Sequence, residues 1–266
     1  MAKVPLTAEG RSRKWKVRKD IIMKLDVVLP LYHPHDGWDR HILEAVRGLR
    51  SHFAGQDAEL HFYITNDGSP LTCYPEEKLR AISDAAGGNF HFLPYEKNHG
   101  KGYSLRYMIS RTDGDFIVYT DGDFPFGWES AAQAFELLRN GADVVMGKRG
   151  TDYRTALSPL RKILSRGTRF LNRLLMGLPS DYLDTQAGLK GFGRAGKALF
   201  LKTETDTFVF DTEFILLAWK NKLKIEPLPI RIRPGLMLSS MSFKVMLREL
   251  LLFLRILWKI RILRKY

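Results

Sequence analysis

The sequence predicts an α/β domain in which helices cover both faces of a mostly parallel β-sheet. Three observations favour this class: short apolar runs rich in β-forming residues alternate with stretches of helical spacing, each early run leads into a polar loop, and 45% of the 266 residues are hydrophobic. A chain of this length buries a real core, in one large domain or in one and a half.

The predicted strands alternate with predicted helices along most of the chain. Strands are expected at residues 25–31, 59–64, 90–93, 116–119, 143–146 and 225–233, with a shorter strand after residue 188. Helices are expected at residues 38–53, from the loop at 98–102 through 111, and at 128–139 and 214–220. Because parallel strands of such sheets point the same way, ligands bind beyond their carboxyl ends.

The stretch from Asp115 to Phe126, which reads DFIVYTDGDFPF, places two carboxylates directly after a buried strand. Asp121 and Asp123 cannot both stay buried without a partner, because removing one charge from water costs several kcal/mol. At the strand end they can share a hard divalent cation, which keeps open positions for phosphate oxygens. The alternative interpretation is a turn in which Asp caps the helix that begins near Trp128.

Polar side chains also follow the other predicted strands. Asp36, Asp67 and Arg149 stand at positions equivalent to Asp121 and Asp123, each just beyond a strand. Five polar residues at equivalent places are hard to explain as solvated turns alone. They therefore predict a ligand site along the carboxyl edge of the sheet.

The charge balance indicates an anionic partner. Lys and Arg number 42 against 29 Asp and Glu, which gives a net charge of +13. Nucleic acid, a phosphorylated substrate and an anionic membrane all fit this balance. The single cysteine, Cys73, excludes an intramolecular disulfide and a cysteine-based zinc site, and it fits a reducing compartment. We expect neither a signal peptide nor an ordinary transmembrane helix, because no long uncharged apolar run occurs.

The chain is expected to divide into three parts. Residues 1–23 form a basic N-terminal arm, residues 24–240 form the main domain, and residues 241–266 form a basic amphipathic helix at the membrane interface. In that last segment, cations at helical spacing flank a broad apolar face, as in helices that lie on anionic membranes. The alternative is a helix docked on the core or on a partner subunit.

Two glycine-rich stretches match nucleotide motifs only in part. Residues 191–196 read GFGRAG, but they lie late in the chain and lack the acidic residue expected about 20 residues on, so we interpret them as a turn before a short helix. Gly100-Lys101-Gly102 lacks the full P-loop pattern. A glycine-flanked lysine at the start of a helix can nevertheless meet an anion.

Seven stretches carry a family resemblance when they are taken in order. They read VVLPLYHPHD, ITNDGS, NHGKGYSLRYMI, YTDGDFPF, DVVMGKR, DTQAGLKGF and FVFDTEF. As an ordered set they resemble family 2 glycosyltransferases of the GT-A fold, and most nearly the polyprenyl-phosphate and dolichyl-phosphate sugar transferases. The resemblance implies a Rossmann-like, mostly parallel GT-A sheet flanked by helices, with the C-terminal amphipathic helix added to it.

The resemblance also implies which residues bind the donor. Asp36 and Asp67 would hold the base and ribose, and Lys101 would help to fix the nucleotide. Asp121 and Asp123 would bind Mg²⁺ or Mn²⁺ on the diphosphate. The complete nucleotide-binding set implied in this way is Pro30, Tyr32, Asp36, Asp67, Lys101 and Asp121.

A second group of residues is implied for the acceptor side. Arg149, Gln186 and Lys190 would line the pocket for the sugar and the acceptor phosphate. Asp211 falls where related enzymes carry an acidic residue near the acceptor. The catalytic residues implied by the resemblance are Asp123, Asp211, Arg149 and Lys190.

The chain departs from the family pattern at two places. The usual Asn-Glu after the first strand is here His33 with Asp36 further on, which changes the nucleotide contact. Pro125 stands two places after the second carboxylate of the metal pair, where the family carries a polar residue, and this removes one metal ligand.

The expected function is an inverting, metal-dependent transfer of a sugar from a UDP- or GDP-sugar to a polyprenyl phosphate lipid. The enzyme would be a hexosyltransferase of cell-envelope biosynthesis, bound peripherally to the cytoplasmic, inner face of the membrane. Its partners would be the nucleotide-sugar donor, the lipid phosphate acceptor and the anionic membrane surface, without nucleic acid. Self-association stays open.

Three alternatives keep part of this pattern. A glycosyltransferase of surface-polysaccharide synthesis would use the same donor site with a sugar-hydroxyl acceptor. A sugar nucleotidyltransferase would usually need a Gly-rich, Arg-containing loop after the first strand, and LPLYHPHD has none. A basic nucleic-acid or membrane binder would explain the charge, but carboxylates at strand ends repel phosphates unless a metal intervenes.

Overall fold

The computed structural model describes residues 22–150, 166, 167, 169, 170, 172, 173, 177–207, 209–233 and Leu252. The predicted arm at residues 1–23 lies outside this part of the chain except for its last two residues, and Met23 already belongs to the first strand. The predicted helix at residues 241–266 also lies outside it except for Leu252, which is partly buried against the core.

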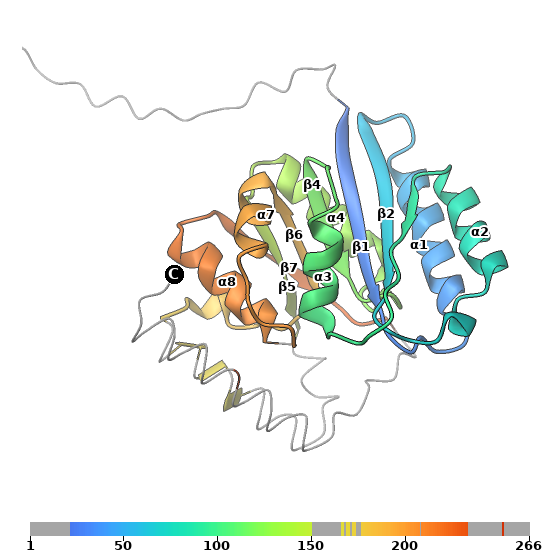
Figure 1. Cartoon of the computed structure of the whole chain (residues 1–266). Coiled ribbons are helices and arrows are strands. Elements are labelled where there is room, and N and C mark those ends of the chain that lie inside the picture. The colour runs from blue at the N-terminus through green and yellow to red at the C-terminus, as the bar shows by residue number, and fades with distance from the viewer. Residues whose placement is uncertain are drawn as a thin grey trace, which may run out of the picture.

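A seven-stranded sheet forms the centre of the molecule (Figure 1). Its strands are β1 (Met23–Leu31), β2 (Ala58–Asn66), β3 (Phe90–Phe92), β4 (Phe116–Thr120), β5 (Val144–Arg149), β6 (Leu189–Gly193) and β7 (Ile225–Ile230). Their order across the sheet is β3-β2-β1-β4-β6-β5-β7. Strand β6 runs antiparallel to both of its neighbours, whereas the pairings among the other named strands are parallel.

Helices cover both faces of this sheet, as Figure 1 shows. They are α1 (Trp38–His52), α2 (Glu76–Ala86), α3 (Lys101–Ile109), α4 (Gly127–Arg139), α7 (Arg194–Phe200) and α8 (Phe210–Lys220). Short 3₁₀ turns lie at Leu71–Cys73 and Ser180–Tyr182. In the part of the chain that these elements cover, we find no helix long and apolar enough to cross a membrane.

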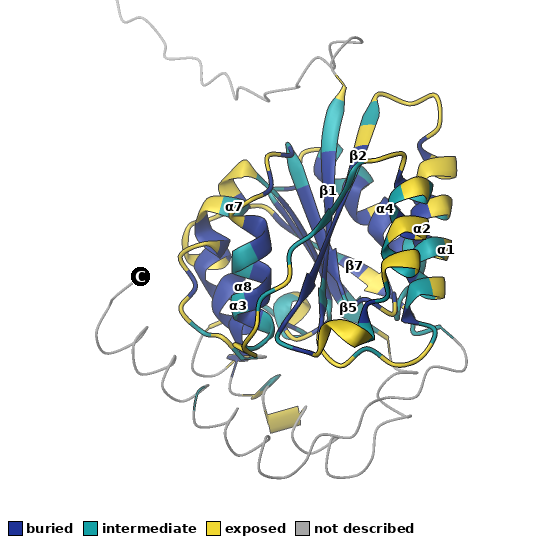
Figure 2. Cartoon of the chain, turned by 45° about the vertical axis from the view of Figure 1, so that its right-hand side comes forward, coloured by how far each residue is buried: buried dark blue, intermediate teal, exposed yellow. Residues whose placement is uncertain are grey.

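Two hydrophobic cores lie on opposite faces of the sheet. Successive side chains of a strand point to opposite faces, so Val27 joins the core under α1, α2 and α4, and Val28 joins the core under α3, α7 and α8. Strand β4 divides in the same way, with Val118 on the first face and Tyr119 on the second. Figure 2 shows the buried side of each helix turned toward the sheet. Both faces of the central strands are therefore buried, as in other parallel sheets.

The predicted fold class is confirmed, and the differences lie in particular elements. Helix α2 has no counterpart in the sequence analysis. Helix α8 begins at Phe210 rather than Phe214, so Asp211 stands in its first turn. The last strand ends at Ile230, short of the expected residue 233. This strand carries two prolines, which an edge strand tolerates because its outer side forms no ladder.

Candidate functional site

The carboxyl ends of β1, β2, β4 and β5 meet at one edge of the sheet, and the amino end of β6 joins them there. Because β6 is antiparallel, Lys190 stands opposite Tyr119 of β4 and Met146 of β5. The loop before β6 thereby comes close to the residues that follow β4. The sequence analysis had no signal for this direction of β6.

Asp121 is held between a cation and the loop before β6. The ammonium nitrogen of Lys101, the first residue of α3, lies 2.5 Å from Oδ1 of Asp121. A Cβ atom on Gly188 would lie only 2.4 Å from Oδ2 of the same carboxylate. Burial alone would lower the pKa of Lys101, but the charges of Asp121 and Asp211 outweigh it and raise that pKa. Lys101 therefore stays positively charged beside Asp121.

Asp123 lies in a tight turn directly after Asp121. The amide of Phe124 donates to the Asp121 carbonyl over 2.9 Å, and Phe124 adopts a φ of 45° while its ring is buried. A left-handed conformation at a bulky residue is strained, and such strain is common at functional sites. Asp123 keeps contact with solvent, but desolvation by its surroundings and the charge of Asp121 raise the pKa of its carboxyl group.

The pair of carboxylates fits a divalent cation. Desolvation and then the charge of Asp121 raise the pKa of Asp123, and a cation shared by the two carboxylates would offset both effects. Among the residues that the structure describes, no cluster of three or more His, Cys, Asp or Glu side chains forms a metal cage. Two carboxylates with remaining positions for water and phosphate oxygens are typical of Mg²⁺ bound with a nucleotide.

A buried trio lies beside this pair, between β4, β6 and α8. The ammonium of Lys190 lies 3.2 Å from Oδ1 of Asp211 and donates to the Ala187 carbonyl over 2.5 Å. The hydroxyl of Tyr119 donates to the same carboxylate oxygen. Burial lowers the pKa of Lys190 despite its acidic partner, and burial with the charge of Asp211 raises the pKa of Tyr119 well above its ordinary value.

The position of Lys190 differs from the one expected for it. Its side chain is fully buried, so it does not line an open pocket as the resemblance implied. The physical reason is the pairing of Lys190 with Tyr119 of β4. Paired residues of neighbouring strands point to the same face of the sheet, so both side chains enter the core under α8. Lys190 instead fixes the carbonyl of Ala187 in the loop that touches Asp121. Its contact with a ligand stays a prediction.

Arg149 is bound by Asp184 at the end of β5. The backbone amide of Arg149 donates to Asp184 over 2.8 Å, and its Nε and Nη2 atoms donate over 3.0 and 2.5 Å. Burial alone would raise the pKa of Asp184, but the hydrogen bonds and charge of Arg149 lower it below the ordinary value. Gln186, two residues beyond Asp184, is exposed. The structure thus places the predicted acceptor residues near one edge but gives Arg149 a protein partner.

Asp67 holds the loop that leads into α3. Its carboxylate accepts from the amides of His99 and Gly100, at 2.8 and 3.0 Å, and from Nδ2 of Asn98 at 3.1 Å. These three donors take up most of the acceptor positions of the carboxylate. A contact between Asp67 and a nucleotide stays a prediction.

The other predicted nucleotide residues follow β1. Pro30 lies in the strand, and Tyr32 and Asp36 are exposed in the loop beyond it. Tyr32 as a residue is 53% exposed, which leaves about half of its surface available to a ligand. The amide of His33 donates to Oγ of Ser69 over 2.8 Å, so this loop is tied to the one after β2.

The glycines on either side of Lys101 make room for the backbone of a neighbouring loop. The amide of Gly102 donates to the Asp206 carbonyl over 2.8 Å, and a Cβ atom on Gly102 would lie 2.3 Å from the Thr205 carbonyl oxygen. Gly100, with a φ of 98°, packs against Asp206 in the same way. The short motif GKG therefore reports close packing of two loops, which the sequence analysis did not anticipate.

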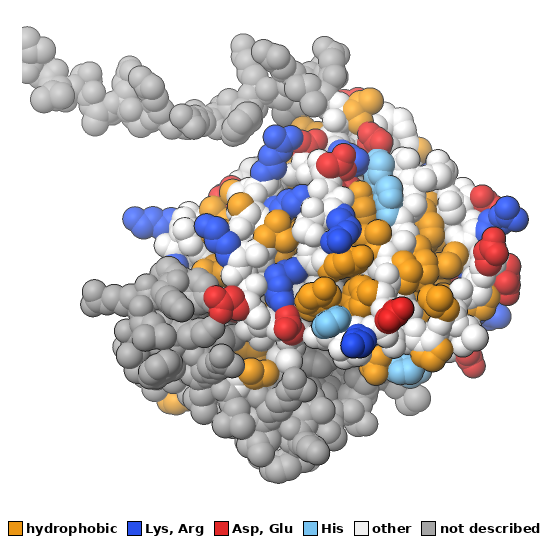
Figure 3. Space-filling model, in the orientation of Figure 1, with side chains coloured by type: hydrophobic (Ala, Val, Ile, Leu, Met, Phe, Trp, Pro, Cys, Tyr) orange, Lys and Arg blue, Asp and Glu red, His pale blue; other side chains and the backbone are white. Residues whose placement is uncertain are grey.

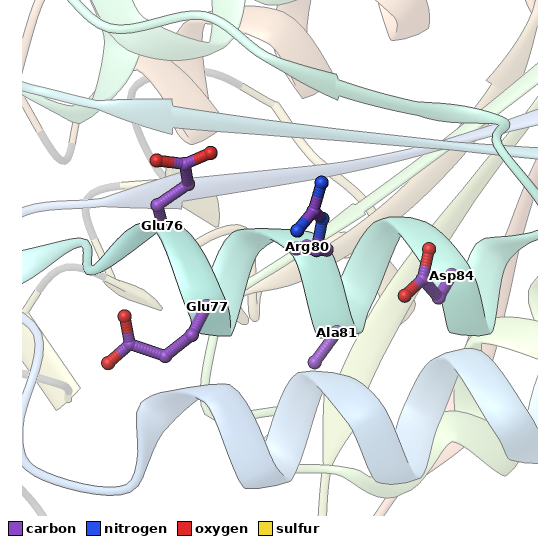
Figure 4. Close-up of a pocket in the computed structure, with 5 residues that line it drawn as sticks. All are labelled: Glu76, Glu77, Arg80, Ala81 and Asp84. Carbon is purple, nitrogen blue, oxygen red and sulfur yellow. The ribbon is translucent and has the colours of Figure 1, made fainter.

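Two surface features lie apart from this site. A shallow pocket on helix α2 is lined by Glu76, Glu77, Arg80, Ala81 and Asp84 (Figure 4). It contains none of the predicted site residues. On the face shown in Figure 3, side chains of both charges are scattered among hydrophobic ones and form no continuous basic band.

Comparison with known proteins supplies the family. The model of the family described as "Glycosyl transferase family 2" matches residues 27–190. Among curated proteins, the chain is 25% identical over 222 residues to dolichyl-phosphate beta-glucosyltransferase ALG5A of Trichomonas vaginalis, which covers 77% of this chain and 64% of that protein.

Two further relatives are similar at the same level. The chain is 24% identical over 224 residues to the dolichyl-phosphate beta-glucosyltransferase of Saccharomyces cerevisiae, covering 77% of this chain and 66% of that protein. It is 25% identical over 220 residues to low-salt glycan biosynthesis hexosyltransferase Agl6 of Haloferax volcanii, covering 81% and 49%. The chain thus spans 49% to 66% of the length of these relatives.

Solved structures share the fold. Mannosyl-3-phosphoglycerate synthase from Rubrobacter xylanophilus superposes with a TM-score of 0.61 at 16% identity, covering 89% of this chain and 73% of that one. Glucosyl-3-phosphoglycerate synthase from Mycobacterium tuberculosis, in complex with UDP, gives 0.60 at 14% identity, covering 89% and 79%. Other crystals of the latter protein contain Mn²⁺ or Mg²⁺ together with UDP. At these identities the likeness shows the GT-A architecture.

Proposed function

The chain belongs to glycosyl transferase family 2, and from this premise we propose that it transfers a sugar from a nucleoside diphosphate-sugar to a polyprenyl phosphate lipid. The proposed reaction inverts the sugar carbon and depends on a divalent metal. The observation that carries the lipid-phosphate acceptor is the state of Asp211, which is buried and already bound by Lys190 and Tyr119.

The donor side rests on Asp121, Asp123 and Lys101. Asp121 and Asp123 would hold a divalent cation, whose chemistry is to neutralise negative charge on a departing nucleoside diphosphate. Lys101 supplies a positive charge at the same place, held by the helix that it begins. Preorganised charges of this kind stabilise a transition state because they require no rearrangement when charge develops.

The acceptor side follows from the protonation requirements of the two acceptor classes. A sugar hydroxyl must lose a proton as it attacks, so its enzyme needs a base within hydrogen-bond reach. A lipid phosphate is already anionic at neutral pH and needs none. Asp211 receives a hydroxyl hydrogen bond and an ammonium partner inside the core, which leaves it poorly placed to accept a substrate proton. This arrangement favours the phosphate acceptor.

The relatives support the same proposal from their printed names. Two are dolichyl-phosphate beta-glucosyltransferases, which names a lipid phosphate, and the solved glucosyl-3-phosphoglycerate synthase from Mycobacterium tuberculosis binds UDP with Mn²⁺ or Mg²⁺. We further propose that the enzyme works on the cytoplasmic face of a membrane, because the sequence of residues 241–266 suits an interfacial helix. On the face drawn in Figure 3, Lys and Arg side chains form no continuous band of the kind that a nucleic-acid groove needs.

The proposal can be tested with a panel of nucleotide-sugars. Wild-type protein would be screened by thermal shift against UDP- and GDP-sugars with Mg²⁺ or Mn²⁺, and each stabilising donor would then be incubated with dolichyl or undecaprenyl phosphate. We expect a product whose mass equals the lipid phosphate plus one sugar residue (the sugar less one water), with release of the nucleoside diphosphate, and no product with the matching unphosphorylated polyprenol. Transfer to a sugar hydroxyl, with no product from either lipid phosphate, would contradict the proposed acceptor.

A further inference from the structure

Lys101 lies beside the carboxylate to which a donor and its metal ion would bring new charge. Its ammonium nitrogen is 2.5 Å from Oδ1 of Asp121, and its side chain is only 16% exposed. Asp121 is also one of the two residues that would hold the divalent cation under the proposed function. The carboxylate of Asp121 is therefore already paired with the ammonium group of Lys101 before any ligand binds.

The backbone around Lys101 is fixed from two sides. Asp67 accepts from the amides of His99 and Gly100, and the amide of Gly102 donates to the Asp206 carbonyl over 2.8 Å. Arg106 binds the Thr205 carbonyl over 2.7 Å and so joins the same loops one turn further along α3. The backbone on either side of Lys101 is thus anchored, whereas the side chain carries its ammonium on a four-carbon stem of rotatable bonds.

Two cations bound to one carboxylate, even on its two separate oxygens, lie close together and repel each other. A divalent cation that binds Asp121 must therefore weaken the ion pair with Lys101. A nucleoside diphosphate that arrives with the cation brings its own negative charge to the same place. Lys101 would then regain an anionic partner without any movement of its anchored backbone.

We propose that Lys101 is the resident counter-cation of the donor site. It pairs with Asp121 while the site is empty, gives that carboxylate up to the divalent cation, and then binds the nucleoside diphosphate. The inference rests on the proposed function and adds an exchange of partners to it. Lys101 therefore weakens the binding of the metal ion alone and strengthens the binding of the metal ion together with the nucleotide.

Binding measurements on Lys101→Met test this exchange. The binding of Mn²⁺ would be followed by the electron paramagnetic resonance of free Mn²⁺, first alone and then with UDP or GDP. We expect Lys101→Met to bind Mn²⁺ alone about tenfold more tightly than wild type, because a neighbouring positive charge is gone, and to bind the nucleoside diphosphate with Mn²⁺ about tenfold more weakly. Lys97→Met is the matched control, since Lys97 is an exposed lysine of the same loop.

The possible outcomes distinguish a failure of the exchange of partners from a failure of the proposed donor site. If Lys101→Met binds Mn²⁺ alone no more tightly than wild type, while nucleotide with Mn²⁺ still binds to both, the exchange is wrong and the donor site stands. If wild type binds no Mn²⁺ with UDP or GDP, both the donor site and the exchange are wrong.

A second measurement uses only the wild-type protein and does not depend on the folding of a variant. Lysine acetylation, followed by mass spectrometry, would compare Lys101 with Lys97 as an internal reference. The exchange predicts that Mn²⁺ alone increases the acetylation of Lys101 and that Mn²⁺ with UDP or GDP decreases it again. Unchanged acetylation of Lys101 on addition of Mn²⁺ would overturn the exchange.

Discussion

The ammonium nitrogen of Lys190 lies 3.2 Å from Oδ1 of Asp211, and their side chains are 0% and 5% exposed. The pair joins the antiparallel strand β6 to the first turn of α8. Through its second contact, at the Ala187 carbonyl, Lys190 also fixes the loop that touches Asp121. One buried ion pair therefore couples the stability of the core to the shape of the site.

Replacing Lys190 with Met should destabilise the fold strongly. The variant leaves the Asp211 carboxylate buried without its cation, and breaking a buried pair in this way typically costs about 3–5 kcal/mol. The free energy of unfolding from urea titration measures the loss. The double variant Lys190→Met with Asp211→Asn should recover part of it, because neither partner then carries a charge. A loss well under about 1 kcal/mol in the single variant would show that the pair carries little of the stability.

Replacing Asp211 with Asn should leave transfer to a lipid phosphate largely intact. The proposed acceptor needs no base, so we expect kcat to fall by less than about tenfold, whereas loss of a catalytic base typically removes about 10²–10⁴. Turnover would be measured at a temperature at which the variant is folded, with donor binding as the control. Near-total loss of turnover with unchanged donor binding would instead indicate a hydroxyl acceptor with Asp211 as its base.

Replacing Gly188 with Ala should weaken donor binding more than it weakens the fold. The new methyl group would approach Oδ2 of Asp121 to 2.4 Å and push this carboxylate out of place. Gly193→Ala is the matched control, because a Cβ atom there meets only ordinary contacts, the nearest at 3.7 Å. Calorimetric titration with a nucleoside diphosphate and Mn²⁺ should separate the two variants. Equal affinities of the two variants would show that the Asp121 carboxylate can move away from the new methyl group without loss of donor binding.

The ion pair between Arg149 and Asp184 should stabilise the fold in a pH-dependent way. Because the folded pKa of Asp184 lies below its ordinary value of 3.8, the stabilisation is fully present above that value and is lost as the pH falls through the folded pKa. Urea titrations should therefore show a constant gap between wild type and Asp184→Asn at roughly pH 5 to 7, and a narrowing gap in acid. A gap that widens in acid would contradict this sign.

The sequence predicted the parallel part of the sheet and the residues at its edge for a clear physical reason. Buried parallel strands are short apolar runs, and the polar residues directly after them must lie at one edge, so Asp67, Asp121, Asp123 and Arg149 could be assigned to that edge from order alone. The family and the enzyme class inferred from the same stretches are confirmed by the family match over residues 27–190.

The rest of the site depends on contacts that no local pattern encodes. The direction of β6 is set by pairing with two strands far away in sequence, and this pairing turns Lys190 into the core. The glycines beside Lys101 pack against a loop about a hundred residues later in the sequence, at Thr205 and Asp206. The ion pair between Arg149 and Asp184 joins residues far apart in the sequence, so only the three-dimensional structure reveals it.

Helix α2 was within reach of the sequence analysis. Pro75 precedes it, two glutamates stand in its first turn, and Gly87 closes it with a φ of 69°. These are ordinary start and stop signals of a helix. The helix is also amphipathic, with Ile82 and Ala86 as its buried residues, so its periodicity could have been recognised as well.

A crystal structure with Mn²⁺ and a nucleoside diphosphate tests the central claim most directly. The account predicts an anomalous Mn²⁺ peak bound by the carboxylates of Asp121 and Asp123 and by oxygens of the diphosphate. A nucleotide bound at this edge with both carboxylates turned away from it, and no metal between them, would contradict the account.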